Sequence, residues 1–313
     1  MMNNKILRAG IFGVTALASF ALAPFATAQQ ADGPALWHLS DEDSDIYIFG
    51  TIHILPPELE WRNARIDAAF ASADTVYFET PSDEAAQQAM QPLVMQLGLN
   101  HDGRTLSSML DEETNIQFQR VAGSMGLPAA NLEPFKPWVA SLTVTVTYIT
   151  SLGHDPSSGV EQVLTAEAVS AGQSIGYFET PEQQLHFFAD MPEDVQVEAL
   201  SLGLGQIEDG TVAEMMTHMD ESWASGDIAA MNSLMNDDMR DETPEFYEAL
   251  IVNRNRNWVG QVEEILEGSG TAFIAVGAGH LAGDDSLIGM LRARGLEISG
   301  PKVLEKSDAC DSP

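Results

Sequence analysis

Four short apolar runs along the chain have the pattern of buried β-strands. They span residues 46–49, 75–78, 174–178 and 272–276, and each is followed by Gly or by Glu-Thr. Continuous apolar runs of this length, rich in β-branched and aromatic residues, are typical of strands that are buried on both faces. Residues 296–298 form a fifth and weaker candidate.

Segments with helical spacing lie between these runs. Residues 64–73 place their apolar side chains on one face, as a surface helix does. Asp284 and Asp285 precede an apolar run at 287–291, and we expect them to cap a helix there. The stretch 192–268 is expected to be almost entirely helical.

The alternation of strands and helices predicts an α/β fold, with a central mixed sheet, flanking helices and a large helical insertion. No Pro- or Ser-rich linker divides the chain. We therefore expect residues 29–313 to form a single domain, with the insertion at about 192–268.

Two short motifs each occur twice. Residues 77–81, Tyr-Phe-Glu-Thr-Pro, recur at 177–181, and the Gly-x-x-His motif at 50–53 has a counterpart at 277–280. A pseudo-duplicated sheet is one explanation of this echo, and coincidence is the other.

Residues 1–28 have the three-part form of a secretory signal peptide. Lys5 and Arg8 precede an apolar run at 11–23, and Ala-Thr-Ala follows at 26–28. An apolar run of about 13 residues is too short for a membrane anchor, which needs about 20. We expect cleavage after Ala28, a periplasmic or secreted protein, and no stable membrane anchor.

The chain is strongly acidic, with 14 Lys and Arg against 47 Asp and Glu and a net charge of −33. Nucleic acid is excluded as a partner because phosphate binding needs clustered basic residues. The single cysteine, Cys310, can form neither an intrachain disulfide nor a cysteine-based metal cluster. The expected partner is a peptide or small-molecule substrate, or a metal ion.

Candidate chemistry gathers at the ends of the predicted strands. His53 and His280 each follow a strand and a glycine, which places them beyond the carboxyl end of the strand, where ligands bind in α/β sheets. Glu79 and Glu179 also end apolar strands, where a carboxylate is costly unless it is paired, protonated or bound to a cation. Two imidazoles and one or two carboxylates suit Zn²⁺, Mn²⁺ or Co²⁺ and leave room for water.

A histidine after a strand is also a common structural, hydrogen-bonded residue, and Gly-x-x-His is a short motif. Its paired occurrence favours a functional role. The chain has no His-Glu-x-x-His motif, no phosphate-binding loop, no dinucleotide-binding glycine motif and no Gly-x-Ser-x-Gly nucleophile motif.

The order of several short motifs resembles the TraB/GumN family, which is related to the TIKI metalloproteases. The resemblance covers about residues 35–305. The motifs that carry it are Leu36-Trp37, Gly-Thr-Ile-His at 50–53, residues 73–80, Lys136-Pro137-Trp138, Gly-Val-Glu at 159–161, Tyr-Phe-Glu-Thr at 177–180 with 183–185, residues 253–256 with Trp258, and residues 276–281.

This resemblance implies an α/β fold shared with erythromycin esterase-like and haem-binding ChaN-like proteins. In the TIKI branch it implies divalent-metal-dependent peptide hydrolysis that uses both Gly-x-x-His motifs and a strand-end glutamate. On this chain those residues are His53, His280 and Glu79. Arg254 and Asn255 match family-pattern residues near the site. Glu161 stands where family members commonly carry Asp, and we assign it no role from sequence.

With a metal bound, the two histidines and Glu79 are expected to hold the ion and an activated water, whose pKa falls to about 7. Glu179, or Glu79 if it is not a ligand, then acts as general base. Arg254 either stabilises the oxyanion or substrate carboxylate, or forms an ion pair with one of the many acidic residues. Asn255 is expected to support it by hydrogen bonding.

The leading hypothesis from sequence is therefore an exported, divalent-metal-dependent, peptidase-like hydrolase. Three alternatives stay open. One is a metal-independent, esterase-like hydrolase in which a Gly-x-x-His histidine is the general base. The second is a non-catalytic protein that binds haem or a metal. The third is an inactive scaffold or an inhibitor of another exported factor.

Overall fold

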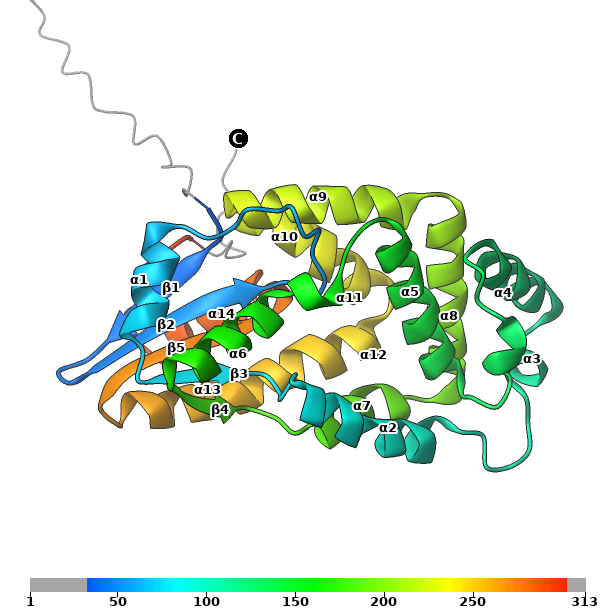
Figure 1. Ribbon diagram of the computed structural model, residues 1–313, viewed down its shortest axis with the longest axis horizontal. Coiled ribbons are helices and arrows are strands. Elements are labelled where there is room, and N and C mark those ends of the chain that lie inside the picture. Colours follow the sequence, from blue (N-terminus) through cyan, green and yellow to red (C-terminus); the bar gives the residue numbers. More distant parts are fainter. Residues whose placement is uncertain (1–32, 303–313) are drawn as a thin grey trace, which may run out of the picture. The chain divides into compact units, whose positions relative to one another are not determined.

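The computed structural model describes residues 33–302, which contain one five-stranded mixed sheet of order β1-β2-β5-β3-β4 (Figure 1). β1 pairs antiparallel with β2, and the other neighbouring strands are parallel. The predicted signal peptide, its cleavage point after Ala28, and Cys310 lie outside the described residues. The strands are β1 (Leu36–Ser40), β2 (Ser44–Thr51), β3 (Thr75–Phe78), β4 (Ser174–Tyr177) and β5 (Gly270–Gly277).

The four apolar runs correspond to β2, β3, β4 and β5, so the α/β fold with a mixed central sheet is confirmed. The expectation that all four strands are buried is wrong for β4, because it lies at the edge of the sheet and its Ser174 and Tyr177 are exposed. The prediction of a strand at 296–298 is wrong. Those residues join no ladder because the carboxyl-terminal segment meets β1 at one point only, an isolated bridge between His38 and Ser299. The carbonyl of Ile298 instead accepts a hydrogen bond from Arg292 at 3.0 Å.

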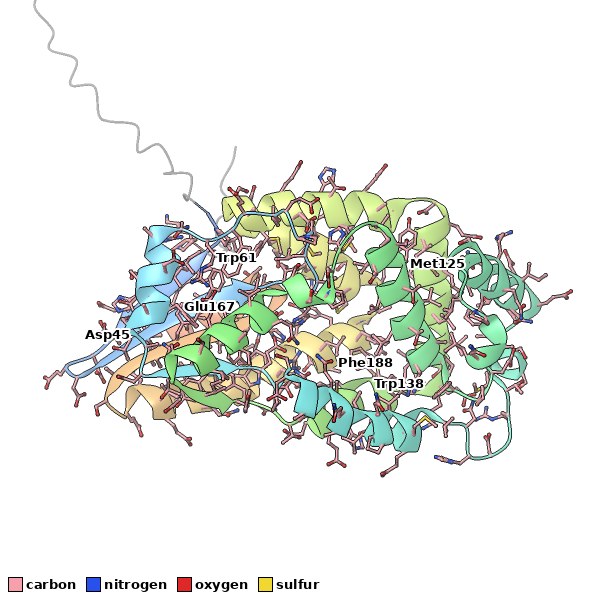
Figure 2. All side chains as sticks on the ribbon, in the orientation of Figure 1. Asp45, Trp61, Met125, Trp138, Glu167 and Phe188 are labelled. Atoms are coloured by element: carbon pink, nitrogen blue, oxygen red, sulfur yellow. The ribbon has the colours of Figure 1, made fainter. Side chains whose placement is uncertain are left out.

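Helices cover both faces of the sheet, because successive side chains of a strand point to opposite faces. In β5, Phe273 and Ala275 pack into one apolar cluster, and Ile274 and Val276 pack into the other. Figure 1 shows α1 and α6 on the near side of the sheet, and Figure 2 shows the side chains around them. The helices of the first cluster include α1 (Ala64–Ser72) and α6 (Val160–Ala171), and those of the second are α13 (Asn253–Leu266) and α14 (Leu287–Ala293).

Sequence located the beginning of α1 correctly but assigned the wrong cap to α14. α1 begins within its predicted range, and the side chain of Asn63 accepts hydrogen bonds from the first-turn amides of that helix. The expectation that Asp284 and Asp285 cap α14 is wrong. The helix begins at Leu287, so the residue in cap position is Ser286, whose hydroxyl accepts from the Gly289 amide at 3.1 Å.

The stretch 192–268 is helical, as expected, and it includes two π-helical turns. Its last helix packs on the sheet. Among residues 33–302, no helix has both the length and the apolarity needed to cross a membrane. The elements of this stretch are α8 (Glu193–Glu208), α9 (Thr211–Ser225), α10 (Ile228–Asn232), η3 (Ser233–Asp237), α11 (Asp238–Glu242), α12 (Pro244–Tyr247), η4 (Glu248–Val252) and α13.

The remaining helical elements precede the insertion, except η5, which follows β5. They are α2 (Glu84–Gly98), α3 (Leu106–Met109), α4 (Glu112–Ser124), η1 (Ala129–Asn131), α5 (Pro137–Ser151), η2 (Pro156–Ser158), α7 (Pro181–Ala189) and η5 (Ala278–Leu281).

In this strand order, the two copies of each repeated motif follow adjacent strands. β2 and β5, which lead into the two Gly-x-x-His motifs, are adjacent and parallel, and so are β3 and β4, which lead into the two Glu-Thr-Pro motifs. The carboxyl ends of these four strands therefore lie on one edge of the sheet.

Candidate active site

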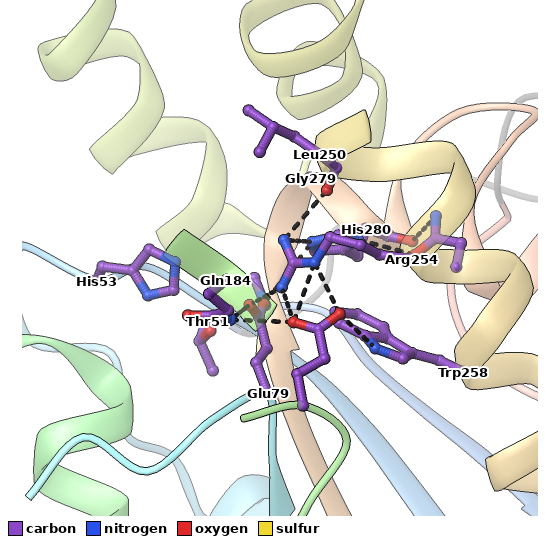
Figure 3. A network of polar contacts seen from close by, with 12 residues as sticks. Thr51, His53, Glu79, Gln184, Leu250, Arg254, Trp258, Gly279 and His280 are labelled. Atoms are coloured by element: carbon purple, nitrogen blue, oxygen red, sulfur yellow. Dashed lines mark hydrogen bonds and ion pairs between the residues drawn. The ribbon is translucent and has the colours of Figure 1, made fainter. Parts of the chain in front are cut away.

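Five of the six site residues that the sequence singled out form one buried hydrogen-bonded network at this edge (Figure 3). The sixth, His53, lies to one side of the network in Figure 3 and pairs with a different residue. The network contains Glu79, Glu179, Arg254, Asn255 and His280.

Arg254 is the centre of the network, and its side chain is 8% exposed. Its Nε donates to Glu179 at 2.9 Å, and its Nη2 donates to both Glu179 and Glu79. Its Nη1 donates to the Leu250 carbonyl at 3.1 Å and to His280 Nε2 at 2.9 Å. Burial opposes the charge of Arg254, but the two carboxylates outweigh it and raise its pKa. The geometry matches the ion-pair interpretation of Arg254.

The two carboxylates are held from several sides. Glu79 Oε1 accepts from the Gly277 amide at 2.6 Å, and Glu179 Oε1 accepts from the Trp258 indole at 2.9 Å. The Gln184 amide group donates to both carboxylates at 3.2 Å. Burial alone would raise the pKa of Glu79, but the Arg254 guanidinium, with smaller contributions from protonated His53 and the Gly277 amide, lowers it below its usual range. Glu79 is therefore ionised at neutral pH.

His280 is a neutral imidazole whose protonated nitrogen is defined by its neighbours. Asn255 Nδ2 donates to the carbonyls of Asp285 at 2.8 Å and of His280 at 3.3 Å. This leaves Asn255 Oδ1 to accept from His280 Nδ1 at 2.8 Å. Nε2 of His280 then carries the lone pair that faces Arg254. Burial, followed by the charge of Arg254, lowers the pKa of His280 to about 3.

The charge state of His53 differs from that of His280. Its Nδ1 lies 2.7 Å from Glu161 Oε1, and its side chain is 66% exposed, compared with 11% for that of Glu161. Glu161 is the main cause that raises the pKa of His53 to about 9, with a smaller contribution from Glu79. His53 is therefore an imidazolium at neutral pH.

Gly277 lies where these groups meet, and a side chain at this position would crowd them. A carbon atom in the Cβ position of this residue would lie 3.1 Å from Glu79 Oε1, 3.6 Å from His280 Cδ2 and 3.9 Å from His53 Nε2. An ionised carboxylate and a protonated imidazole thus converge on one small region of the sheet edge. Such a pair, with pKa values shifted apart, is typical of acid–base sites.

The donor groups in this arrangement do not fit a divalent metal ion. Nε2 of His280 is occupied by the Arg254 guanidinium, which also lies against Glu79 and Glu179. Across residues 33–302, no group of three or more His, Cys, Asp or Glu side chains is arranged to hold a metal. An ion bound by His53, His280 and Glu79 would require Arg254 to release His280.

Sequence reasoning gave no role to three residues that contact the site. Glu161 holds His53, Gln184 bridges the two carboxylates, and Trp258 binds Glu179. A usable signal existed for Trp258, because it lies four residues after Arg254 and so shares a helix face with it. No comparable local signal connects Glu161 to His53, because the two come together only through the packing of α6 against the end of β2.

A further histidine, His154, lies outside this cluster. It is buried, and its Nε2 lies 2.9 Å from Asp220 Oδ2 of α9. It takes no part in the network around Arg254.

The chain is similar to known proteins over almost all of the described residues. The model of the TraB/PrgY/gumN family matches residues 35–300. An uncharacterized protein of Treponema pallidum (strain Nichols) is 22% identical over 274 residues, which cover 83% of this chain and 80% of that protein. No solved structure matches.

Proposed function

The chain belongs to the TraB/PrgY/gumN family, and from this premise we propose that it is an exported hydrolase whose active site is the edge of the sheet around Gly277. The observation that carries the proposal is the convergence there of ionised Glu79 and protonated His53. Peptides or small molecules with an amide or ester bond are the substrate class. The net charge of −33 favours neutral or cationic ones.

In this mechanism, Glu79 and His53 divide the two proton transfers of hydrolysis. Glu79 Oε1 orients a water molecule and takes its proton as the water oxygen bonds to the carbonyl carbon. His53 Nε2 gives its proton to the leaving amine or alkoxide as the carbon–heteroatom bond breaks. Glu79 then returns a proton to His53 through solvent, which restores both groups.

The buried network keeps Glu79 in its ionised state and in a single position. Arg254 supplies the compensating charge, and the Gly277 amide fixes Oε1. His280 and Asn255 in turn hold one N–H of Arg254. Glu179 shares the guanidinium and so sets how much positive charge reaches Glu79. These five residues position the site rather than transfer protons.

Bond hydrolysis by the purified protein is the direct test. Panels of fluorogenic peptides and esters are offered after exhaustive dialysis against EDTA. The expected result is turnover of at least one substrate, with a loss of about 100-fold or more in Glu79→Gln, because general acid–base catalysis typically contributes that much. Glu167→Gln, on an exposed carboxylate paired with Arg62, is the control and keeps full activity. Equal activity of the two variants would refute the role of Glu79.

The metal-dependent hydrolase implied by the family resemblance stays a prediction and has its own test. Metal content is measured in the purified protein and in the His53→Ala/His280→Ala double variant. Equal content in the two proteins contradicts a site on these histidines. Turnover only after Mn²⁺, Co²⁺ or Zn²⁺ is added contradicts the metal-free mechanism. Haem binding without turnover, seen as an absorption band on haem addition, would support the non-catalytic alternative.

Export rests on the form of residues 1–28. Expression of the full chain in a bacterial host, followed by mass measurement of the periplasmic or secreted fraction, is expected to show a chain that begins at Gln29. A full-length chain that stays in the cytoplasm would contradict export.

A further inference from the structure

We propose that Glu161 is a positioning residue for His53, and that it fixes the imidazole with Nδ1 as donor and with Nε2 on the side of Gly277 and Glu79. This inference rests on the proposed function and adds to it a residue to which sequence reasoning gave no role. It is carried by two independent observations, the contact itself and the way the two loops are fastened together.

The first observation is the arrangement of donors on one carboxylate oxygen. Glu161 Oε1 lies 2.7 Å from His53 Nδ1 and also accepts the hydroxyl of Thr51. Glu161 is buried, and His53 is mostly exposed. Two donors on one oxygen hold the carboxylate in place, and a carboxylate held in this way defines both the protonated nitrogen and the orientation of the imidazole.

The second observation is that the start of α6 is fastened to the segment that carries His53. The Val160 amide donates to the Ile52 carbonyl at 3.0 Å, and the Asp155 amide donates to the Leu55 carbonyl at 2.9 Å. Between these two bonds, Gly159 lies against the backbone of His53, where a Cβ atom would be 2.1 Å from the carbonyl oxygen. The backbone beside Glu161 therefore cannot shift independently of the backbone of His53.

The pairing with Glu161 determines which nitrogen of His53 exchanges a proton with a substrate. With Nδ1 committed to Glu161, the proton that His53 exchanges with a substrate is the one on Nε2. Without the carboxylate, a neutral imidazole can carry its proton on either nitrogen, and the exposed ring can rotate about its side-chain bonds. Glu161 thus acts through His53 and does not need to touch the substrate.

The test is the proton on His53 Nδ1, observed directly by NMR in protein labelled with ¹⁵N-histidine. A hydrogen bond to a carboxylate moves such a proton far downfield and slows its exchange. We expect this signal in the wild type, and its loss in His53→Gln assigns it. Glu161→Gln keeps the shape of the side chain, removes its charge, and is expected to abolish the signal or move it upfield.

Glu167→Gln, in the same helix and on an exposed carboxylate, is the matched control and leaves the signal unchanged. An unchanged signal in Glu161→Gln overturns the inference, whether or not a substrate is known. If that variant does not fold, Thr51→Val removes only the second donor and is expected to shift the same proton. No shift there overturns the shared-oxygen arrangement.

With a substrate in hand, Glu161→Gln is expected to lower kcat about 10- to 100-fold, as the loss of a partner that orients a functional histidine does, and to leave KM within about twofold. A change in KM alone, with kcat equal to that of Glu167→Gln, also overturns the inference. Failure of every variant to turn over any substrate would count against the proposed function. In that case, the NMR signal would still test the contact between Glu161 and His53.

Discussion

Arg254→Met is the most revealing perturbation of this protein, because it removes the cation that two buried carboxylates share. Met keeps much of the apolar stem of Arg and supplies no donor. The substitution deletes the contacts of Arg254 with Glu79, Glu179, His280 and the Leu250 carbonyl. Both carboxylate side chains are only 7% exposed, so water cannot replace the lost charge without opening the site.

The expected cost follows from that burial. Removing one partner of a buried ion pair typically destabilises a protein by about 3–5 kcal/mol, a large part of the total of about 5–15 kcal/mol. The matched control is Arg256→Met, two residues along α13. Arg256 pairs with Glu248 through side chains that are 57% and 49% exposed. Loss of an exposed pair of this kind costs about 0–1 kcal/mol.

The cost in Arg254→Met should also depend on pH, with a defined sign. In the wild type the guanidinium lowers the pKa of Glu79, so the stability it contributes is present above the ordinary carboxyl pKa and is lost only in strong acid. In the variant, burial without the cation raises the carboxyl pKa. A raised pKa gives stability at low pH that is lost as pH increases. The variant is therefore less destabilised at about pH 5 than at about pH 8.

Urea unfolding followed by far-ultraviolet circular dichroism at both pH values measures these differences. The expected order at pH 8 is wild type, then Arg256→Met, then Arg254→Met well below both. Two results would refute the reasoning. One is a cost for Arg254→Met no larger than that for Arg256→Met. The other is a cost that is the same at both pH values.

Three further predictions test other parts of the structure. Because His53 must be protonated to act as the acid and Glu161 raises its pKa to about 9, kcat is expected to fall as pH increases through that value; a pH–rate profile that rises there contradicts the assignment. Gly159→Ala forces a Cβ against the His53 carbonyl and is expected to lower stability by about 1–3 kcal/mol. Gly123→Ala, which meets nothing within 4 Å, serves as control in the same urea assay and should not destabilise. Raising NaCl from about 0.05 to 1 M is expected to raise the melting temperature, because salt screens the repulsion among the excess carboxylates; a decrease in a thermal scan would contradict this.

Sequence predicted those parts of the fold that depend on local patterns. Thr75–Phe78 has the same bounds in the structure as in the prediction, because a continuous apolar run leaves a buried strand as the simplest solution. Leu36–Ser40 was not predicted as a strand. Its partly exposed His38 and exposed Ser40 interrupt the apolar residues, and its strand state depends on pairing with β2.

Sequence predicted the part of the site that is formed by residues at the strand ends. Glu79, Glu179 and His280 meet because parallel strands bring their carboxyl ends to one edge. The charge balance of the site was not predictable, because Arg254 enters it from a helix whose rotation depends on packing against the sheet. The same holds for Glu161, which reaches His53 only through contacts between α6 and the end of β2.

The central claim is that His53 transfers a proton during bond hydrolysis at this edge of the sheet. It is tested most directly by the turnover rate, in the presence of EDTA, of His53→Gln relative to His38→Gln. His38 pairs with Asp45 at the same 2.7 Å, with Asp45 near the opposite end of β2, so it controls for loss of a histidine–carboxylate pair. We predict a loss of about 100-fold or more in His53→Gln and none in His38→Gln. Equal rates in the two variants would contradict the account.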